Sequence, residues 1–137
     1  GRPLPGARLQ AWPGGQATSG DDGRYALRAR LLGPSRLADD GPAADLLARL
    51  GREAWRPAHL RLRVVAPGCR PLSTELFRRD SPHLDADALF GARRTLLADC
   101  VRHPPGPTPD GSLSSVPFDT LAFDLVLQPA GGSPCAT

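Results

Sequence analysis

The segment 56–68, RPAHLRLRVVAPG, constrains the fold most strongly because its polar and apolar residues alternate. The apolar positions are Leu60, Leu62 and Val64. The polar positions are His59, Arg61 and Arg63. Alternation of this kind predicts a β-strand with one buried and one solvated face. Half-burial needs no histidine and no arginines, so the polar face is a candidate functional surface.

Strand patterns recur along the chain. The segments with this pattern are 6–12, 24–31, 71–77 and 118–128. The segment 93–103 fits a helix or a strand by pattern alone, and the strand pattern on each side of it favours a strand. Segments 13–23, 33–42, 78–92 and 104–117 are rich in turn-forming residues and predict loops, the last of them a mobile excursion.

One helix is predicted, over residues 43–52. Leu46, Leu47 and Leu50 have helical spacing, and Gly51 stands where a helix commonly ends. Many strands and one short helix indicate an all-β fold, an antiparallel β-sandwich. We expect one domain over 1–129, followed by a flexible C-terminal tail over 130–137.

The charge distribution limits the partners. All 17 basic residues are arginines, and they are scattered along the chain, whereas nucleic-acid binding uses a concentrated basic patch. The net charge of +3 fits an anionic small molecule better. No apolar run is long enough to cross a bilayer, so we expect neither a nucleic-acid nor a membrane partner.

The three cysteines, Cys69, Cys100 and Cys135, are an odd number without close spacing. This argues against a disulfide framework and against a zinc site. It favours a reducing compartment, and hence a cytoplasmic location.

Five blocks of the sequence carry a resemblance to a known family. They are GRPLPGARLQAW, DDGRYALR, the long block 41–77 around Arg-Pro-Ala-His, DALFGARRTLLADCVRH and PFDTLAFDLVL. In order and spacing they resemble the catalytic domain of the intradiol ring-cleavage dioxygenases, the catechol and hydroxyquinol 1,2-dioxygenases. The resemblance implies a β-sandwich. Larger members add an N-terminal helical dimerisation domain, to which nothing here corresponds, and homo-oligomerisation is left open.

The resemblance also implies a ferric ion held by two histidines and two tyrosines. His59 occupies the position of the first histidine, but Arg61 occupies the second. A guanidinium has no lone pair to offer a metal. The single tyrosine, Tyr25, matches a residue of the family that is not an iron ligand, and the region of Ser35, where a ligand tyrosine belongs, has none. A transition metal needs several converging ligands, so we expect no metal and no other cofactor.

The remaining pocket residues are assigned through the resemblance. Arg56 matches the family's active-site arginine beside the substrate, and we expect Trp12 and Ser35 to contribute to substrate binding as well. A surface arginine that fixes the loop before the strand is the alternative for Arg56.

Three residues are candidates for catalysis. His59 suits proton transfer near neutral pH, and Arg61 suits stabilisation of an oxyanion. Glu75, which replaces a glutamine of the family, would pair with Arg61 or orient His59. The alternatives are a structural histidine, a solvated arginine and a structural salt bridge. Asp80, His83, Asp85 and Asp87 resemble a metal cluster, but the matching family loop holds no metal.

Three functions are open. The first is a metal-free enzyme that acts on a phenolic or polyketide-like molecule by acid–base chemistry, such as cyclisation, isomerisation or dehydration. The second is a non-catalytic homologue that binds an aromatic molecule or stabilises a partner protein. The third is an iron(III)-dependent ring-cleavage dioxygenase with ligands from outside this chain.

Overall fold

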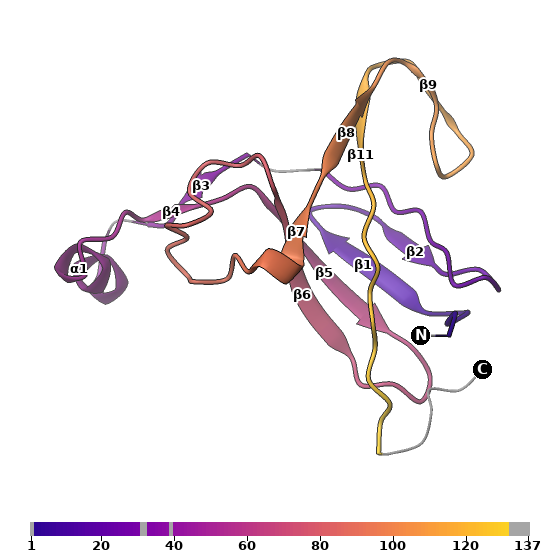
Figure 1. The fold of residues 1–137 in the computed structure, drawn as a ribbon, viewed down its shortest axis with the longest axis horizontal. Helices are drawn as coiled ribbons and strands as arrows, with labels where there is room; N and C mark the ends of the chain where they lie inside the picture. Colours follow the sequence, from indigo (N-terminus) through magenta and orange to yellow (C-terminus); the bar gives the residue numbers. More distant parts are fainter. Residues whose placement is uncertain (1, 31–32, 39, 132–137) are drawn as a thin grey trace.

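The computed structural model describes residues 2–30, 33–38 and 40–131, and it contains mainly strands (Figure 1). In chain order the elements are β1 (Arg8–Trp12), β2 (Gln16–Thr18), β3 (Ser35–Arg36), α1 (Pro42–Arg49), β4 (Trp55–Arg56), β5 (His59–Val65), β6 (Leu72–Arg78), the 3₁₀ turn η1 (Arg94–Leu96), β7 (Leu97–Ala98), β8 (Cys100–His103), β9 (Gly106–Pro107), β10 (Leu113–Ser114) and β11 (Phe118–Leu121).

The central sheet has the strand order β2-β1-β5-β6-β7. Its first three pairings are antiparallel, and the pair β6–β7 is parallel. The all-β fold class is confirmed, and the parallel pair at this edge is an exception to the predicted antiparallel pairing. The chain between β6 and β7 is long enough to return to the starting end of the sheet, as a parallel pair requires.

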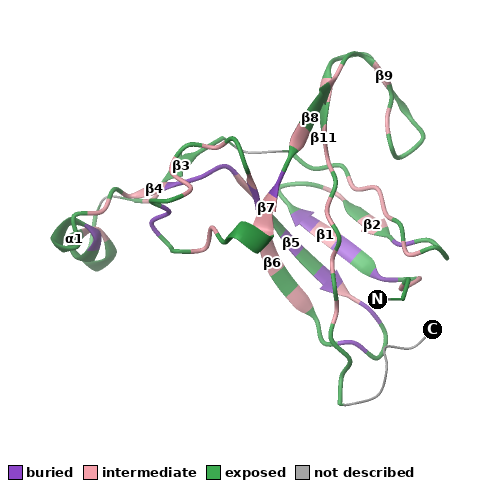
Figure 2. Ribbon diagram, viewed as in Figure 1, coloured by how far each residue is buried: buried purple, intermediate pink, exposed green. Residues whose placement is uncertain are grey.

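The alternation of residues 59–65 has the predicted effect. Strand β5 buries Leu60, Leu62 and Val64 on one face and leaves Arg61 and Arg63 exposed on the other. The buried face meets two adjoining core clusters, one around Leu62 and Leu76 and the other around Leu9 and Val64. The alternating buried and exposed positions are visible along β1 and β5 in Figure 2.

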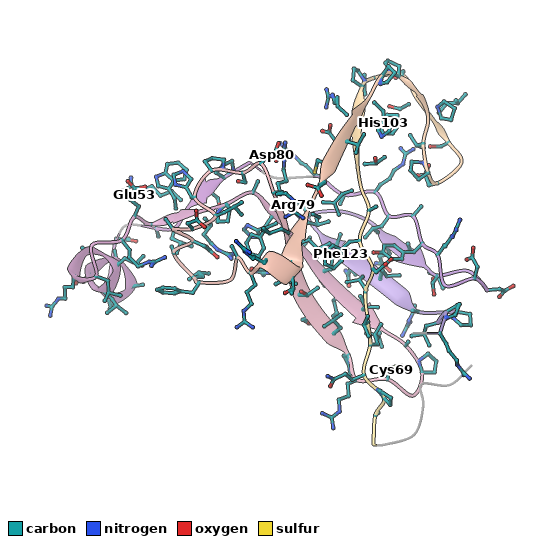
Figure 3. All side chains as sticks on the ribbon, viewed as in Figure 1. Glu53, Cys69, Arg79, Asp80, His103 and Phe123 are labelled. Atoms are coloured by element: carbon teal, nitrogen blue, oxygen red, sulfur yellow. The ribbon has the colours of Figure 1, made fainter. Side chains whose placement is uncertain are left out.

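A second layer covers this apolar face. The segment that follows β11 runs across the central sheet (Figure 1), and Phe123 lies over the sheet in Figure 3. Phe123 and Leu125 pack against the core, as do Tyr25 and Leu27. The predicted strands 24–31 and 118–128 are mostly extended segments rather than ladder strands. The described part of the first makes one isolated bridge, Gly14↔Ala29, and the second pairs only over Phe118–Leu121.

The predicted helix is present as α1, followed by a residue in the right-handed conformation, Leu50, and by Gly51 at φ +64°. Glycine adopts this left-handed conformation at little cost, so Gly51 ends the helix as expected. Leu47 is buried, but Leu46 and Leu50 are exposed. The helix and the ribbon β3–β4 form an arm beside the sheet (Figure 1), which leaves these leucines without an apolar partner layer in the described chain.

The region 93–117 is more regular than predicted. Residues 93–103 form η1, β7 and β8, and the expected mobile excursion contains the short hairpin β9–β10. Arg28 holds this hairpin by hydrogen bonds to Asp110, Thr108 and Ser112. The hairpin is held by polar contacts, so its sequence lacks the alternating apolar pattern from which a strand is predicted.

Cys69 is disulfide-bonded, a bond that the number and spacing of the cysteines did not predict, whereas Cys100 is free. The cytoplasmic location rested on that count and stays a prediction. Of the predicted tail 130–137, residues 132–137 lie outside the described residues, and the Ala130 N–H donates to the Gly68 carbonyl. Among the described residues, no helix has the length and apolarity needed to cross a membrane.

Candidate functional site

The polar face of the central sheet brings most of the predicted site residues together. Trp12 of β1 is opposite Arg61 of β5, and Arg61 is opposite Glu75 of β6. His59 lies two residues before Arg61 on the same face and is opposite Phe77. Because residues directly opposite each other on neighbouring strands share a face, Trp12, Arg61 and Glu75 form one row across the sheet.

Arg56 of β4 reaches this face and contacts several of its side chains. We call the group of five contacting side chains the arginine cluster: Arg56, His59, Arg61, Glu75 and Asp87. The Arg56 side chain is only 4% exposed. Its Nη2 donates to Glu75 Oε2 at 2.8 Å, and its Nε donates to Asp87 Oδ1 at 3.1 Å. Ser35 meets Arg56 only as the backbone partner in the ribbon β3–β4. The guanidinium is therefore buried and doubly paired rather than on the surface, and its role beside a substrate stays a prediction.

Glu75 lies between two arginines. Arg56 donates to both of its carboxylate oxygens, and Arg61 Nη2 lies 3.3 Å from Oε1. The hydrogen bond from Arg56 lowers the pKa of Glu75, against a smaller opposing effect of burial. Glu75 is therefore an anion over the physiological range, and the pairing with Arg61 that the sequence suggested is present.

His59 is mostly buried, with 13% of its side chain exposed. Its Nδ1 lies 2.9 Å from the Pro57 carbonyl, which can only accept, so Nδ1 carries the proton. Its Nε2 lies 3.2 Å from Arg56 Nη1 and accepts from it. In this arrangement the imidazole carries one proton, on Nδ1, and the lone pair of Nε2 accepts the hydrogen bond from Arg56. The ring centroid of Phe77 lies 5.6 Å from that of the imidazole.

Asp87 is a member of the cluster that the sequence singled out only as part of a loop resembling a metal site, and not as a partner of Arg56. It is 2% exposed although it follows a polar loop, and it accepts from Arg56 and from the Leu89, Gly91 and Ala92 N–H groups. Burial raises the pKa of Asp87, but Arg56 and the Gly91 and Leu89 N–H groups outweigh burial and hold the pKa below its usual range. The loop sequence carries no local signal that an arginine 31 residues earlier is its partner.

The donors at this face do not fit the family's ferric ion. The His59 lone pair is bonded to Arg56, and Arg61 is a cation. Tyr25 packs against the opposite, apolar face of the sheet, where its hydroxyl donates to the Phe123 carbonyl. Burial, followed by the charge of Asp124, raises the pKa of Tyr25, which disfavours the tyrosinate that binds iron. The described residues include no cluster of three or more histidine, cysteine or acidic side chains arranged to hold a metal, and this covers the loop 80–87.

The cluster is mostly buried and reaches the open face of the sheet at Arg61. Arg61 is 61% exposed along its side chain, and Trp12 is 42% exposed. Two cavities of about 370 and 310 Å³ lie elsewhere, one against the apolar side of β5 and β6 and one beside α1. None of the three predicted catalytic residues lines either cavity. A ligand at the cluster would therefore rest on the sheet surface beside Arg61 and Trp12.

Because of the two carboxylates in the cluster, we expect the free energy of unfolding to fall in acid. Glu75 and Asp87 have lowered pKa values in the folded chain, so the unfolded state binds more protons as the pH falls. Their contribution is complete above the ordinary values of 4.5 and 3.8 and is lost as the pH falls through the lowered ones. We expect urea unfolding to give a free energy of unfolding that falls between about pH 5 and pH 3.

A matched pair of variants assigns this acid dependence. Glu75→Gln should flatten the dependence, because one of the titrating carboxylates is gone. Asp99→Asn, at an exposed pair with Arg79, should leave the dependence unchanged. Equal slopes for both variants would contradict the assignment to the arginine cluster.

Comparison with known proteins identifies the family. A family model described as Dioxygenase (Dioxygenase_C) matches residues 9–129. The chain is 36% identical to the 6-chlorohydroxyquinol 1,2-dioxygenase of Cupriavidus pinatubonensis, over 94% of this chain and 50% of that protein. It is also 36% identical to the hydroxyquinol 1,2-dioxygenase of Nocardioides simplex, over 95% of this chain and 51% of that protein.

The solved structures agree. Hydroxyquinol 1,2-dioxygenase from Pseudomonas putida DLL-E4 superimposes with a TM-score of 0.82 at 31% identity, over 95% of this chain and 52% of that one. The chain belongs to the intradiol ring-cleavage dioxygenase family, and its fold is that of the family's catalytic domain. It spans about half the length of these relatives.

Proposed function

We propose that the protein binds a catechol-type aromatic, of the hydroxyquinol or catechol class, at the arginine cluster. The observation that carries the proposal is the 36% identity to two hydroxyquinol dioxygenases along nearly the whole chain. The geometry adds a reason. Arg61 presents an exposed guanidinium beside the exposed indole of Trp12, a combination that suits an aromatic ring bearing acidic hydroxyl groups.

Of the reactions open to such a site, the comparisons favour ring cleavage, which is the activity in the relatives' names. Ring cleavage relies on a ferric ion in this family. The donor set of the described residues does not fit that ion, so its ligands would have to come from outside them. The part that this chain contributes is then recognition of the substrate by Arg61 and Trp12, the exposed side chains beside the cluster.

Metal-free acid–base chemistry is the second candidate. It is favoured by a neutral His59 whose Nε2 lies 3.2 Å from Arg56 and 4.0 Å from Glu75. A phenolic hydroxyl that replaced the Arg56 contact could give its proton to Nε2. His59→Ala should then abolish turnover more than it weakens binding, because proton transfer acts in the transition state.

The experiment that decides between these candidates combines binding, iron and turnover. The 137-residue chain, expressed in iron-replete medium, is titrated with catechol and hydroxyquinol while its tryptophan fluorescence is followed. Oxygen uptake reports ring cleavage, and chromatography reports any other product. Binding without oxygen uptake supports recognition by this chain, whereas absence of binding to both compounds overturns the proposal.

Arg61→His tests the metal fit directly, because it restores the family's pair of histidines on β5. We expect elemental analysis to show far less than one iron per chain in both the variant and the unmodified chain. The tyrosines are still absent, and a metal needs converging ligands. The variant should also bind a phenolate more weakly by about 1.5–3 kcal/mol, the worth of a hydrogen bond to a charged group. About one iron per variant chain would show that the donor set had been misjudged.

A further inference from the structure

The two oxygens of Asp87 have separate partners. Oδ2 accepts from the Gly91 and Ala92 N–H groups at 2.8 and 3.1 Å, so it belongs to the loop. Oδ1 accepts from Arg56 Nε at 3.1 Å and from Leu89 N–H at 3.3 Å. A carboxylate fixed by three backbone donors is a rigid acceptor, and it holds the inner edge of the Arg56 guanidinium.

The contact between Asp87 and Nε influences the direction in which the two outer nitrogens of the Arg56 guanidinium point. With Nε held by Asp87, the two outer nitrogens face Glu75 and His59, at 2.8 Å for Nη2 and 3.2 Å for Nη1. A guanidinium is planar, so the contact at Nε restricts the directions of the two outer nitrogens, which Glu75 also holds. Without Asp87, the arginine would keep its charge and its contacts with Glu75 but lose the acceptor that the loop fixes at Nε.

The packing around this contact is tight. A Cβ at Gly91 would lie 3.2 Å from Asp87 Oδ2 and 3.3 Å from Arg56 Nη2, so a side chain here would require these two groups to move by a few tenths of an ångström. Arg52 Nη2 donates to the Asp87 carbonyl at 3.0 Å, and the guanidinium of Arg52 lies 4.0 Å over the Phe90 ring. The loop is therefore docked from both sides of Asp87.

We infer that Asp87 is the positioning residue of the arginine cluster and aims Arg56 at Glu75 and His59 through the docked loop 87–92. In the proposed aromatic site, Asp87 would thus hold Arg56 in place, and this part of the inference rests on the proposed function. Asp87 has no contact with a ligand in this role; it acts through Arg56.

The test uses ¹⁵N NMR of the full chain without ligand, so its outcome is independent of whether an aromatic binds. In the unmodified chain, the buried Arg56 Nε–H should give a side-chain signal that exchanges slowly with water. In Asp87→Asn, one of the two carboxylate oxygens becomes an NH₂ group. That group would face either the Arg56 Nε–H or the N–H groups of Gly91 and Ala92, and it cannot accept from them. We expect the Arg56 Nε–H to exchange about ten-fold faster or more, which is the loss of one charge-assisted hydrogen bond.

Two further variants keep the result interpretable. Asp85→Asn, in the same loop but exposed, should leave the Arg56 signal unchanged. Gly91→Ala replaces Asp87→Asn where the latter does not fold, and should speed the same exchange by displacing Arg56 and Asp87 together. The inference is overturned if a folded Asp87 or Gly91 variant shifts the amide signals of Leu89 and Ala92 but leaves the Arg56 signal as before. That result would assign Asp87 to the loop alone.

Discussion

Arg56→Leu should lower the free energy of unfolding by about 3–5 kcal/mol, the cost of removing one partner from a buried ion pair. The variant leaves Asp87, which is 2% exposed, and Glu75, whose side chain is 23% exposed, without their shared cation. Leucine fills part of the volume but supplies none of the donors. Urea or guanidinium unfolding of the purified variant at neutral pH measures the difference.

Arg61→Ala is the matched control for this prediction. Arg61 binds the same carboxylate, Glu75, but its side chain is 61% exposed. An exposed ion pair contributes about 0–1 kcal/mol, so the control should stay within that range. A similar loss of free energy of unfolding in the two variants would mean that the burial of Arg56 does not increase its contribution to stability.

Phe77→Ala should cost about 3–5 kcal/mol as well, through loss of buried aromatic volume. Phe77 has no exposed surface, and its ring centroid lies 5.6 Å from that of the His59 imidazole and 5.8 Å from the guanidinium of Arg56. The change therefore removes the apolar support beneath the polar cluster. Unfolding experiments on the variant give the magnitude.

Leu113→Ala is the control for the second prediction, because Leu113 is 79% exposed on the short hairpin. Exposed substitutions of this kind usually change stability by about 0.5 kcal/mol or less. A small effect of Phe77→Ala, comparable with this control, would show that the cluster does not depend on the ring below it.

The sequence predicted the parts of the fold that depend on periodicity. The alternation of residues 59–65 gave the central strand and its buried face, and the leucine spacing gave the helix that ends before Gly51. The extended second layer was harder, because the leucines of 118–128 alternate whether or not their backbone forms a ladder. The parallel edge β6–β7 depends on the path of a loop, which local patterns do not encode.

The candidate site was predictable only in part, for a similar reason. Alternation placed His59 and Arg61 on one face, and cross-strand register then brought Trp12 and Glu75 beside them. Asp87 enters the site through tertiary docking of a polar loop onto Arg56, and a loop carboxylate gives no local sign of its partner. The disulfide of Cys69 was missed because a count of cysteines says nothing about their distances.

The arginine cluster is electrically balanced before any ligand arrives. Two guanidinium groups, Arg56 and Arg61, face two carboxylates, Glu75 and Asp87, around an imidazole in its neutral tautomer. A phenolate that approaches Arg61 therefore meets an exposed guanidinium that already has one anionic partner, Glu75, at Nη2. Its affinity then depends on the donors of Arg61 that Glu75 leaves open, and on how far Glu75 offsets the positive charge.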